Sequence, residues 1–460
     1  MYYRIKQLLL LSGDIIALYA GFYIGVALRY QEWAPRELPT LLPPISQLFL
    51  GAVVVLFIIG LYDIGRIKNS RTLYQKILLS AGIWVILAIV YFYIKITALV
   101  TPKTTLLGIT LGSFGLLALW RTFYNRFLST VIWRTSIVFA GVSNEVAELA
   151  HLITTEPERG FVIAGLIVPP QKIIPVSLQA YPVAETLTEL TKKNNAHYPE
   201  LVVLNPALRN NTSLLAELYH AIFRQITILD LAEFYETMFR RIPPFTFSEA
   251  WFITNLKEQR RKIYDRARIL VDYALALIML IPFGITFPFI AALVLATSPG
   301  PVFFKQKRVG RLGRVFTIYK YRTMLSLNPD GSAETAGPQF AEVGDRRVTA
   351  VGRLLRRTRL DELPQALNIL RGDMSLIGPR PERPEFVKQL TEAMPFYTVR
   401  HLVKPGLTGW AQLQQAYYGD IEENLYKLQY DLYYIKNRNF FFDATILLKT
   451  VAIIARFMGR

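Results

Sequence analysis

Long apolar stretches without a polar face dominate the first quarter of the chain. Four of them cover, within a few residues, 7–28, 41–64, 77–100 and 104–120. Each approaches the ~20 residues that an α-helix needs to cross a hydrocarbon core of about 30 Å. A soluble bundle of buried helices is the alternative, but residues 50–62 offer no polar face that such a bundle would turn to water. The pattern therefore predicts four membrane-spanning helices.

Basic residues flank these stretches unevenly. The N-terminus, the loop at residues 65–76 and the segment after residue 120 are rich in lysine and arginine, whereas the other two loops carry few such residues. Positively charged loops stay on the cytoplasmic side of a membrane. We therefore expect both ends of the four-helix unit in the cytoplasm.

Short β-branched runs alternate with amphipathic segments between residues 135 and 240. Strands are expected at residues 136–141, 160–168, 200–205 and 226–230, with helices between them. This alternation predicts a Rossmann-like parallel sheet. The first strand is followed by Gly141-Val142-Ser143-Asn144 rather than by Gly-x-Gly-x-x-Gly. We therefore favour a structural or regulatory module, with binding of a nucleotide or another effector as the alternative.

A fifth apolar run covers residues 269–297 and has basic clusters on both sides. Its centre is interrupted by Pro282, Gly284 and Pro288. A straight crossing would leave one basic cluster on the wrong side of the membrane. We therefore predict a helix that enters the membrane, breaks at these residues and returns, with a fifth full span as the alternative. A last apolar stretch, residues 440–458, contains Asp443, Lys449 and Arg456, which favours a helix lying in the membrane interface.

Amino-acid composition excludes several kinds of site and indicates the charge of the partner. The 460-residue chain has no cysteine, which excludes disulfides, thiolate zinc sites and cysteine nucleophiles. Its four histidines show no ligand spacing, which argues against a histidine-based metal site. The net charge of +18 points to an anionic partner. Because the basic residues cluster beside apolar segments rather than with aromatic stacking motifs, lipid or a phosphorylated small molecule is favoured and nucleic acid is not expected.

Asp361 and Glu362 are adjacent carboxylates inside an arginine-rich segment, residues 351–383. Pro364 fits a helix only within the first turn, so a helix is expected to begin near Asp361 and to end at Gly372. Free amides at a helix N-terminus favour anions, including phosphoryl groups. The alternative is that Asp361 only caps the helix while the arginines form surface ion pairs. Local sequence leaves both interpretations open.

Four further segments, residues 298–310, 316–324, 401–412 and 429–439, follow in order around this carboxylate pair. Together they resemble, block by block, the bacterial sugar transferase family. These are polyprenyl-phosphate hexose-1-phosphate transferases, which begin exopolysaccharide, O-antigen or capsule assembly. The resemblance covers residues 260–460. The whole chain is similar to the long form of the family, which carries four membrane helices and a Rossmann-like module in front.

The resemblance implies a reaction. A UDP-sugar donates sugar-1-phosphate to undecaprenyl phosphate, and UMP is released. Asp361 matches the family nucleophile, which forms an aspartyl-phosphosugar intermediate. Mg²⁺ is the expected cofactor, held by Glu362 with Asp361 as a second candidate ligand. The family commonly has Ser-Pro at the helix break, where this chain has Gly284-Ile285, so the depth of the break is left open.

Further site residues follow from the same resemblance. Arg356 and Arg380 match arginines of the family that bind phosphate. A guanidinium group suits this role, because it can donate two hydrogen bonds to one phosphate group. Asp431 matches an acid of the family and is expected to bind substrate, and Lys320 and Arg322 are expected to hold the nucleotide. For each cation, contact with lipid headgroups or a structural ion pair is the alternative.

The expected fold is therefore a membrane α-helical bundle, a Rossmann-like α/β module and a mainly α catalytic domain with a re-entrant helix. We place these at residues 1–130, 131–245 and 246–460. The protein is expected in the bacterial cytoplasmic (inner) membrane as a multi-pass protein, with the catalytic domain facing the cytoplasm. A homodimer is expected from the long-form resemblance.

Two other function classes fit the sequence less well. A nucleotide-sugar dehydratase or epimerase needs Gly-x-Gly-x-x-Gly and a Tyr-x-x-x-Lys pair in a soluble helix, and such pairs occur here only in or beside apolar segments. A non-enzymatic scaffold for polysaccharide export is disfavoured by the intact Asp361-Glu362 pair and Arg380. The identity of the sugar is not visible in the sequence.

Overall fold

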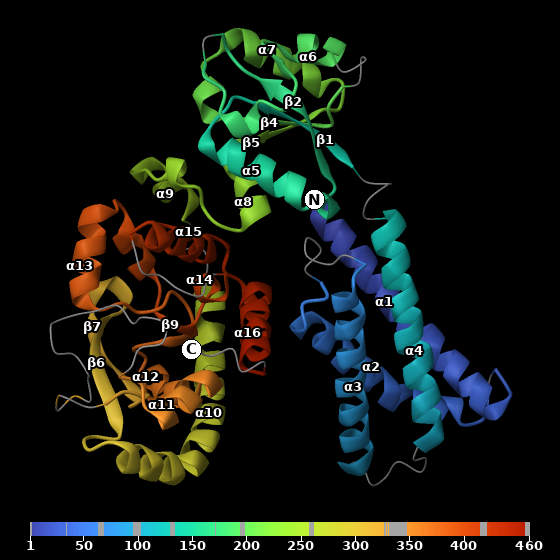
Figure 1. The fold of residues 1–460 in the computed structure, drawn as a ribbon, viewed down its shortest axis with the longest axis vertical. Helices are drawn as coiled ribbons and strands as arrows, with labels where there is room; N and C mark the ends of the chain where they lie inside the picture. The colour runs from blue at the N-terminus through green and yellow to red at the C-terminus, as the bar shows by residue number, and fades with distance from the viewer. Residues whose placement is uncertain are drawn as a thin grey trace. The chain divides into compact units, whose positions relative to one another are not determined.

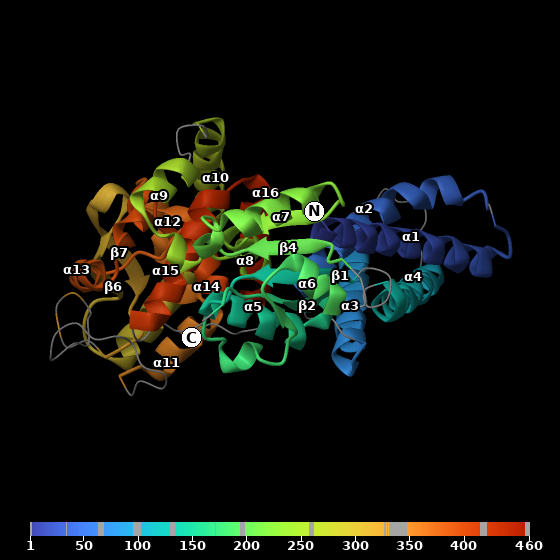
Figure 2. The ribbon, with the colours of Figure 1, turned by 90° about the horizontal axis from the view of Figure 1, so that it is seen from above.

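The computed structural model describes residues 2–33, 35–62, 69–94, 103–128, 134–170, 172–193, 198–256, 262–325, 328, 330, 347–414 and 421–455. Within these ranges the chain forms two compact units, Met1–Phe234 and Tyr235–Arg460. The first unit contains long apolar helices and a parallel sheet, and the second contains one long apolar helix (Figure 1, Figure 2). The carboxylate pair belongs to the second unit.

Four long helices open the first unit, and they coincide with the four apolar stretches of the sequence. They are α1 (Tyr2–Tyr30), α2 (Leu38–Ile58), α3 (Arg71–Ile94) and α4 (Lys103–Phe123), with a π-helical turn after α4 at Tyr124–Leu128. Each is long and apolar enough to cross a membrane. Such a set of helices is typical of a membrane protein.

Helices α1 and α4 pack unusually closely because glycines face each other. Gly21 and Gly25 on α1 meet Gly108 and Gly112 on α4. A Cβ atom added to Gly112 would lie 2.6 Å from the carbonyl oxygen of Gly21, so no side chain fits there. Glycines four residues apart let helix backbones approach in a membrane. The spacing was visible in the sequence, but its pairing partner was not.

Arg121 near the end of α4 belongs to the basic segment after residue 120, but it is not a free flanking charge. Its Nε donates to Asp14 Oδ1 at 2.9 Å, and both side chains are fully buried. Its Nη1 donates to the carbonyl of Leu61. This ion pair therefore joins α1 to α4 inside the apolar helices.

The parallel sheet of the first unit has the strand order β3-β2-β1-β4-β5. Its strands are β1 (Thr135–Ala140), β2 (Phe161–Ile167), β3 (Val183–Ala184), β4 (Leu201–Leu204) and β5 (Thr227–Asp230), connected by α5 (Asn144–Thr155), α6 (Leu187–Lys193) and α7 (Thr212–Ile222) and followed by α8 (Leu231–Phe239). All neighbouring strands are parallel. The order confirms a Rossmann-like sheet and adds β3, which is too short for a periodic signal.

The second unit surrounds the carboxylate pair with short elements. They are α9 (Glu249–Asn255), α10 (Lys262–Thr297), β6 (Phe303–Val309), β7 (Val315–Tyr321), α11 (Ala350–Thr358), the 3₁₀ helix η9 (Leu360–Gln365), α12 (Ala366–Leu370), β8 (Ser375–Ile377), α13 (Pro384–Ala393), the 3₁₀ helix η10 (Tyr397–Leu402), β9 (Gly406–Thr408), α14 (Trp410–Gln414), α15 (Ile421–Asn437) and α16 (Phe440–Ala455). Strands β6 and β7 form an antiparallel hairpin, and β8 and β9 form a parallel pair.

Helix α10 is 36 residues long and contains two internal prolines, Pro282 and Pro288. A proline removes a backbone donor and clashes with the preceding turn, which bends a helix. Figure 1 shows α10 turning sharply toward its C-terminal end. Beyond the bend, Ile290 and Val294 pack against Leu355 of α11. The structure therefore has a bend within one continuous helix rather than two helices separated by a break, and entry into and return from one membrane face stays a prediction.

Helix α16 contains Asp443, one of the charges that favoured an interfacial helix. In the structure this carboxylate is buried within the unit, where it accepts hydrogen bonds from Tyr264 at 2.5 Å and from Tyr434 at 2.9 Å. Asp443 therefore fastens α16 to α10 and α15 rather than facing lipid headgroups. Phe441 at the start of α16 is 88% exposed.

Candidate active site

The carboxylate pair lies just after a reversal of the chain. Helix α11 ends at Thr358 and is followed by Arg359, whose backbone is left-handed with φ of 61°. Residues Leu360–Gln365 then form η9, and α12 continues it. The single helix predicted from Asp361 onward is therefore divided, because the first turn is tighter than an α-helix. Its end is as expected, with Gly372 at φ of 82°.

Glu362 is held by cationic side chains from three different segments. Its Oε1 accepts from Lys320 Nζ of β7 at 2.9 Å and from Arg380 Nη2 at 2.9 Å. Arg359 Nη1 lies 3.8 Å from the same oxygen. Burial alone would raise the pKa of Glu362, but Lys320, Arg380 and Arg359 outweigh it and hold that pKa well below its usual range. Glu362 is therefore an anion at any physiological pH.

Asp361 has the opposite environment. Its side chain is buried, and no hydrogen-bond partner reaches its Oδ1 within the described residues. Burial and the adjacent negative charge of Glu362 raise the pKa of Asp361 to about 6, against the opposing effect of Lys320 and Arg356. Two neighbouring carboxyl groups with such different pKa values are typical of groups with different catalytic roles. Asp361 combines an uncommitted oxygen with raised basicity, which suits a nucleophile.

Positive charge exceeds negative charge around the pair. Four cationic side chains act on the two carboxylates: Lys320, Arg356, Arg359 and Arg380. They come from β7, α11, the residue between α11 and η9, and the segment after β8. The excess of two positive charges predicts an anionic ligand, and guanidinium groups suit phosphate oxygens.

Most of the residues predicted from sequence meet at this place. Arg356 of α11 donates from Nε to Thr323 Oγ1 at 2.9 Å, and this hydrogen bond fixes the orientation of its guanidinium group. Arg380 donates from Nη1 to Gln412 Oε1 at 3.0 Å, so Gln412 of α14 orients it. Sequence reasoning gave no role to Arg359, and it missed Gln412, which contacts Arg380 from 32 residues away.

Two predicted residues do not contact the pair. Arg322 is 2% exposed and donates to the carbonyls of Val294, Ser298 and Pro299. It therefore binds the C-terminal end of α10, as basic side chains at helix ends often do. Asp431 of α15 forms a buried ion pair with Arg400 at 2.7 Å instead.

The predicted break residues Pro282, Gly284 and Pro288 lie on α10, and a Cβ added at Gly284 would meet nothing within 4 Å. Within the described residues, no group of three or more histidines, aspartates and glutamates is arranged to hold a metal ion. A metal at this site would need further oxygen ligands from a bound substrate.

Part of the chain is similar to known proteins. A family described as bacterial sugar transferase matches residues 263–457. The UDP-N-acetylgalactosamine-undecaprenyl-phosphate N-acetylgalactosaminephosphotransferase of Aeromonas hydrophila is 47% identical over 182 residues, which are 38% of this chain and 42% of the relative. The UDP-glucose:undecaprenyl-phosphate glucose-1-phosphate transferase of Escherichia coli (strain K12) is 39% identical over 183 residues, 39% of this chain and 38% of the relative.

A shorter relative is matched over most of its length. The uncharacterized sugar transferase EpsL of Bacillus subtilis (strain 168) is 39% identical over 186 residues, 40% of this chain and 84% of that protein. The matches to the Aeromonas and Escherichia proteins, by contrast, span only about two fifths of their length.

Proposed function

Because the chain belongs to the bacterial sugar transferase family, we propose that it transfers sugar-1-phosphate from a UDP-sugar to undecaprenyl phosphate and releases UMP. The observation that carries this proposal is the carboxylate pair inside an excess of positive charge. Asp361 has a free buried oxygen and a raised pKa, while Glu362 is neutralised by Lys320 and Arg380. This arrangement suits attack by a carboxylate on a diphosphate.

The proposed reaction has two displacements at the sugar-linked phosphorus. An Asp361 oxygen first attacks this phosphorus, and the bond to the bridging oxygen breaks so that UMP leaves with that oxygen. An oxygen of undecaprenyl phosphate then attacks the same phosphorus, and the Asp361 carboxylate is released. The products are UMP and a lipid-linked diphosphosugar. Two such steps are ordinary covalent catalysis by a carboxylate.

The surrounding side chains address the main obstacle, which is repulsion between an anionic nucleophile and an anionic diphosphate. Lys320, Arg356, Arg359 and Arg380 place positive charge where negative charge develops, in a buried site where electrostatic effects are strong. Glu362 is a poor nucleophile, because its Oε1 is occupied and its low pKa makes it a weak base. Through this oxygen Glu362 fixes Lys320 and Arg380.

We further propose that Mg²⁺ accompanies the diphosphate. Such ions usually take one or two carboxylates together with substrate phosphates, so a larger acidic cluster is not required. Glu362 would hold the ion, with the unpartnered Oδ1 of Asp361 as a second donor. Bound there, it would neutralise charge on the phosphates.

The proposal includes a membrane setting. The donor is soluble and the acceptor is a membrane lipid, which suits a catalytic domain (residues 246–460) built on α10 at the cytoplasmic face of the bacterial inner membrane. The four-helix domain (residues 1–130) would anchor it, and residues 131–245 would form the Rossmann-like module. A homodimer and a place at the first step of exopolysaccharide, O-antigen or capsule assembly belong to the same proposal.

The test is release of UMP by the purified full chain in nanodiscs with Mg²⁺, undecaprenyl phosphate and a panel of UDP-sugars. Wild type is compared with Asp361→Asn and with Glu385→Gln, an exposed acid of α13 that serves as a control for charge loss. We expect turnover with wild type and Glu385→Gln and none with Asp361→Asn. Equal release by Asp361→Asn, or release without any undecaprenyl phosphate at a multiple-turnover rate, would refute the proposal.

A further inference from the structure

The segment that carries Arg380 is fixed through its carbonyl groups. Residues 379–382 read Pro-Arg-Pro-Glu, and the two prolines have no backbone donor. Gly406 N donates to Pro379 O at 2.9 Å, and Val309 N donates to Glu382 O at 2.9 Å. Arg308 Nη1 donates to Pro381 O at 3.1 Å. Three of the four carbonyls are therefore held by β6 and β9, and the fourth belongs to Arg380 itself.

The carbonyl of Arg380 is held by a buried side chain. Arg400 Nη2 donates to it at 2.9 Å. Arg400 is 1% exposed, and its guanidinium is fixed by Asp431 Oδ2, at 2.7 Å from Nη2 and 3.1 Å from Nε. Tyr397 OH accepts from Nη1 at 2.9 Å. The position of the Arg380 main chain thus depends on the Arg400–Asp431 ion pair.

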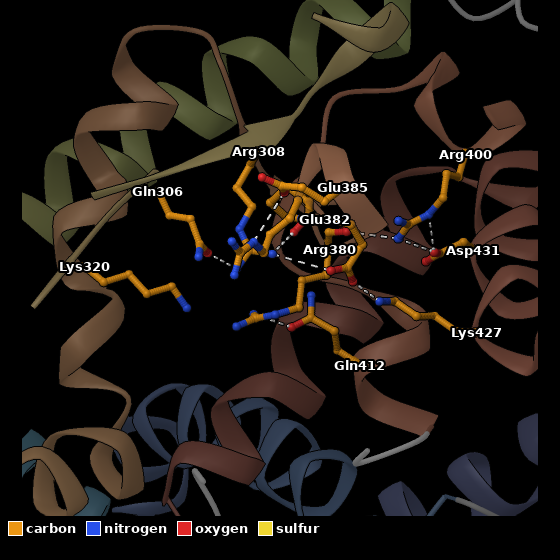
Figure 3. A network of polar contacts seen from close by, with 12 residues as sticks. Gln306, Arg308, Lys320, Arg380, Glu382, Glu385, Arg400, Gln412, Lys427 and Asp431 are labelled. Carbon is orange, nitrogen blue, oxygen red and sulfur yellow. Dashed lines mark hydrogen bonds and ion pairs between the residues drawn. The ribbon is translucent and has the colours of Figure 1, made fainter. Parts of the chain in front are cut away.

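Helix α15 also supports the other end of the segment. Lys427, one turn before Asp431, forms an ion pair with Glu382, and Arg308 Nη1 lies 3.4 Å from Glu382 on the other side. In the view of Figure 3, Lys320 and Asp431 lie on opposite sides of Arg380. The side chain of Arg380 therefore binds Glu362, while its main-chain carbonyl is bound by Arg400.

We infer that Asp431 is a positioning residue that acts through Arg400 to hold Arg380 against Glu362, and that it does not itself contact the substrate. The inference rests on the proposed function and revises the expectation that Asp431 binds substrate. Its basis is a continuous set of contacts, from Asp431 to Arg400, from Arg400 to the Arg380 carbonyl, and from the Arg380 guanidinium to Glu362. A displacement of about 1 Å in such a group costs on the order of 100-fold in rate.

Activity measurements test the link. We expect Asp431→Asn and Arg400→Lys to lower kcat for UMP release by roughly 10- to 100-fold, with a smaller change in KM for the UDP-sugar. Lys436→Gln is the matched control, because Lys436 lies on the same helix but pairs with Glu236. Its kcat should stay within about twofold of wild type.

A double-mutant cycle separates positioning from direct contact. If Asp431 acts through Arg380, then Asp431→Asn adds less than about threefold in an Arg380→Gln background, because the group it positions is already gone. A full 10- to 100-fold further loss in that background would overturn the inference. So would wild-type kcat in the single variant Asp431→Asn.

Hydrogen exchange gives a readout that does not depend on turnover. The amides of Val309 and Gly406 donate to the segment, so they should exchange several-fold faster in Asp431→Asn than in wild type or Lys436→Gln. If wild type releases no UMP with any donor, the proposed function fails, yet faster exchange at these two amides still supports the link. Unchanged exchange at both amides overturns it.

Discussion

Replacing Asp361 with asparagine should stabilise the protein while abolishing its activity. The raised pKa means that the folded state opposes ionisation of this carboxyl group. A rise from 3.8 to about 6 corresponds to about 3 kcal/mol at 1.36 kcal/mol per unit. Between these pH values the folded state binds the proton more tightly than the unfolded state, so the free energy of unfolding falls as pH rises through this window. Above pH 6 the full destabilisation is present.

Asp361→Asn removes this destabilisation without changing the size of the side chain. At pH 7.5 we expect the variant to be more stable than wild type by up to about 3 kcal/mol, and at pH 4 the difference should nearly vanish. For a unit of this size, that corresponds to a rise in Tm of roughly 6–12 °C. Thermal unfolding of the full chain in nanodiscs, followed by tryptophan fluorescence at several pH values, measures it.

Glu362→Gln is the matched control, because the neighbouring carboxyl group should respond in the opposite direction. Its pKa is held low by Lys320, Arg380 and Arg359 despite burial, so its ionised form stabilises the fold above the unfolded-state pKa of about 4.5. Removing that charge should lower Tm at pH 7.5. A lower Tm for Asp361→Asn at pH 7.5, or the same increase at pH 4 and pH 7.5, would refute the electrostatic reasoning.

Three further outcomes are expected. Arg322→Lys should lower Tm and reduce the free energy of unfolding by about 1–3 kcal/mol, because Arg322 binds the end of α10. The kcat per folded molecule should stay within a few-fold of wild type. A selective loss of nucleotide affinity would instead support a substrate contact. Gly112→Leu should disrupt the α1–α4 packing and lower the yield and Tm of the full chain. Gly115→Leu should not, since a Cβ there meets nothing within 4 Å. Equal yield and Tm for the two variants would contradict the close α1–α4 contact. Chelation of Mg²⁺ should stop UMP release and re-addition should restore it, and full activity in excess chelator would exclude the proposed ion.

Hydropathy and periodicity were sufficient for the larger elements. The four apolar helices and the bend in α10 follow from local composition and from two prolines, so no distant contact is needed to predict them. The longer strands of the Rossmann-like sheet were likewise predictable from local sequence. The two-residue strand β3 and the glycine contacts between α1 and α4 were missed because each is defined by its partner.

In the candidate site, too, some features were predictable from the sequence and others depend on distant contacts. The pair Asp361-Glu362 stood out in the sequence, and the resemblance pointed to Lys320, Arg356 and Arg380. The contrast between the two carboxyl groups was not predictable, because it depends on the hydrogen bonds that Lys320 of β7 and Arg380 after β8 donate to Glu362. Arg322 and Asp431 have partners other than the carboxylate pair, and these partners were not predictable from local sequence either.

The resemblance suggested substrate binding for both of these side chains. Their roles in the structure come from partners 23 to 31 residues away. Local sequence gives no sign that Arg322 faces the end of α10 or that Asp431 faces Arg400. A charged residue therefore has to be assigned by what its head group contacts, not by the motif around it.

The central claim is that Asp361 carries the sugar phosphate between the two substrates, and a single-turnover experiment without undecaprenyl phosphate tests it most directly. The full chain is mixed with Mg²⁺ and an excess of the UDP-sugar that supports turnover, quenched in acid, and analysed for UMP and by peptide mass spectrometry. We predict close to one UMP per active site and a sugar-phosphate adduct on the peptide that contains Asp361. Turnover with both substrates present, but neither UMP nor adduct without the lipid, would contradict the claim and indicate direct transfer from donor to acceptor.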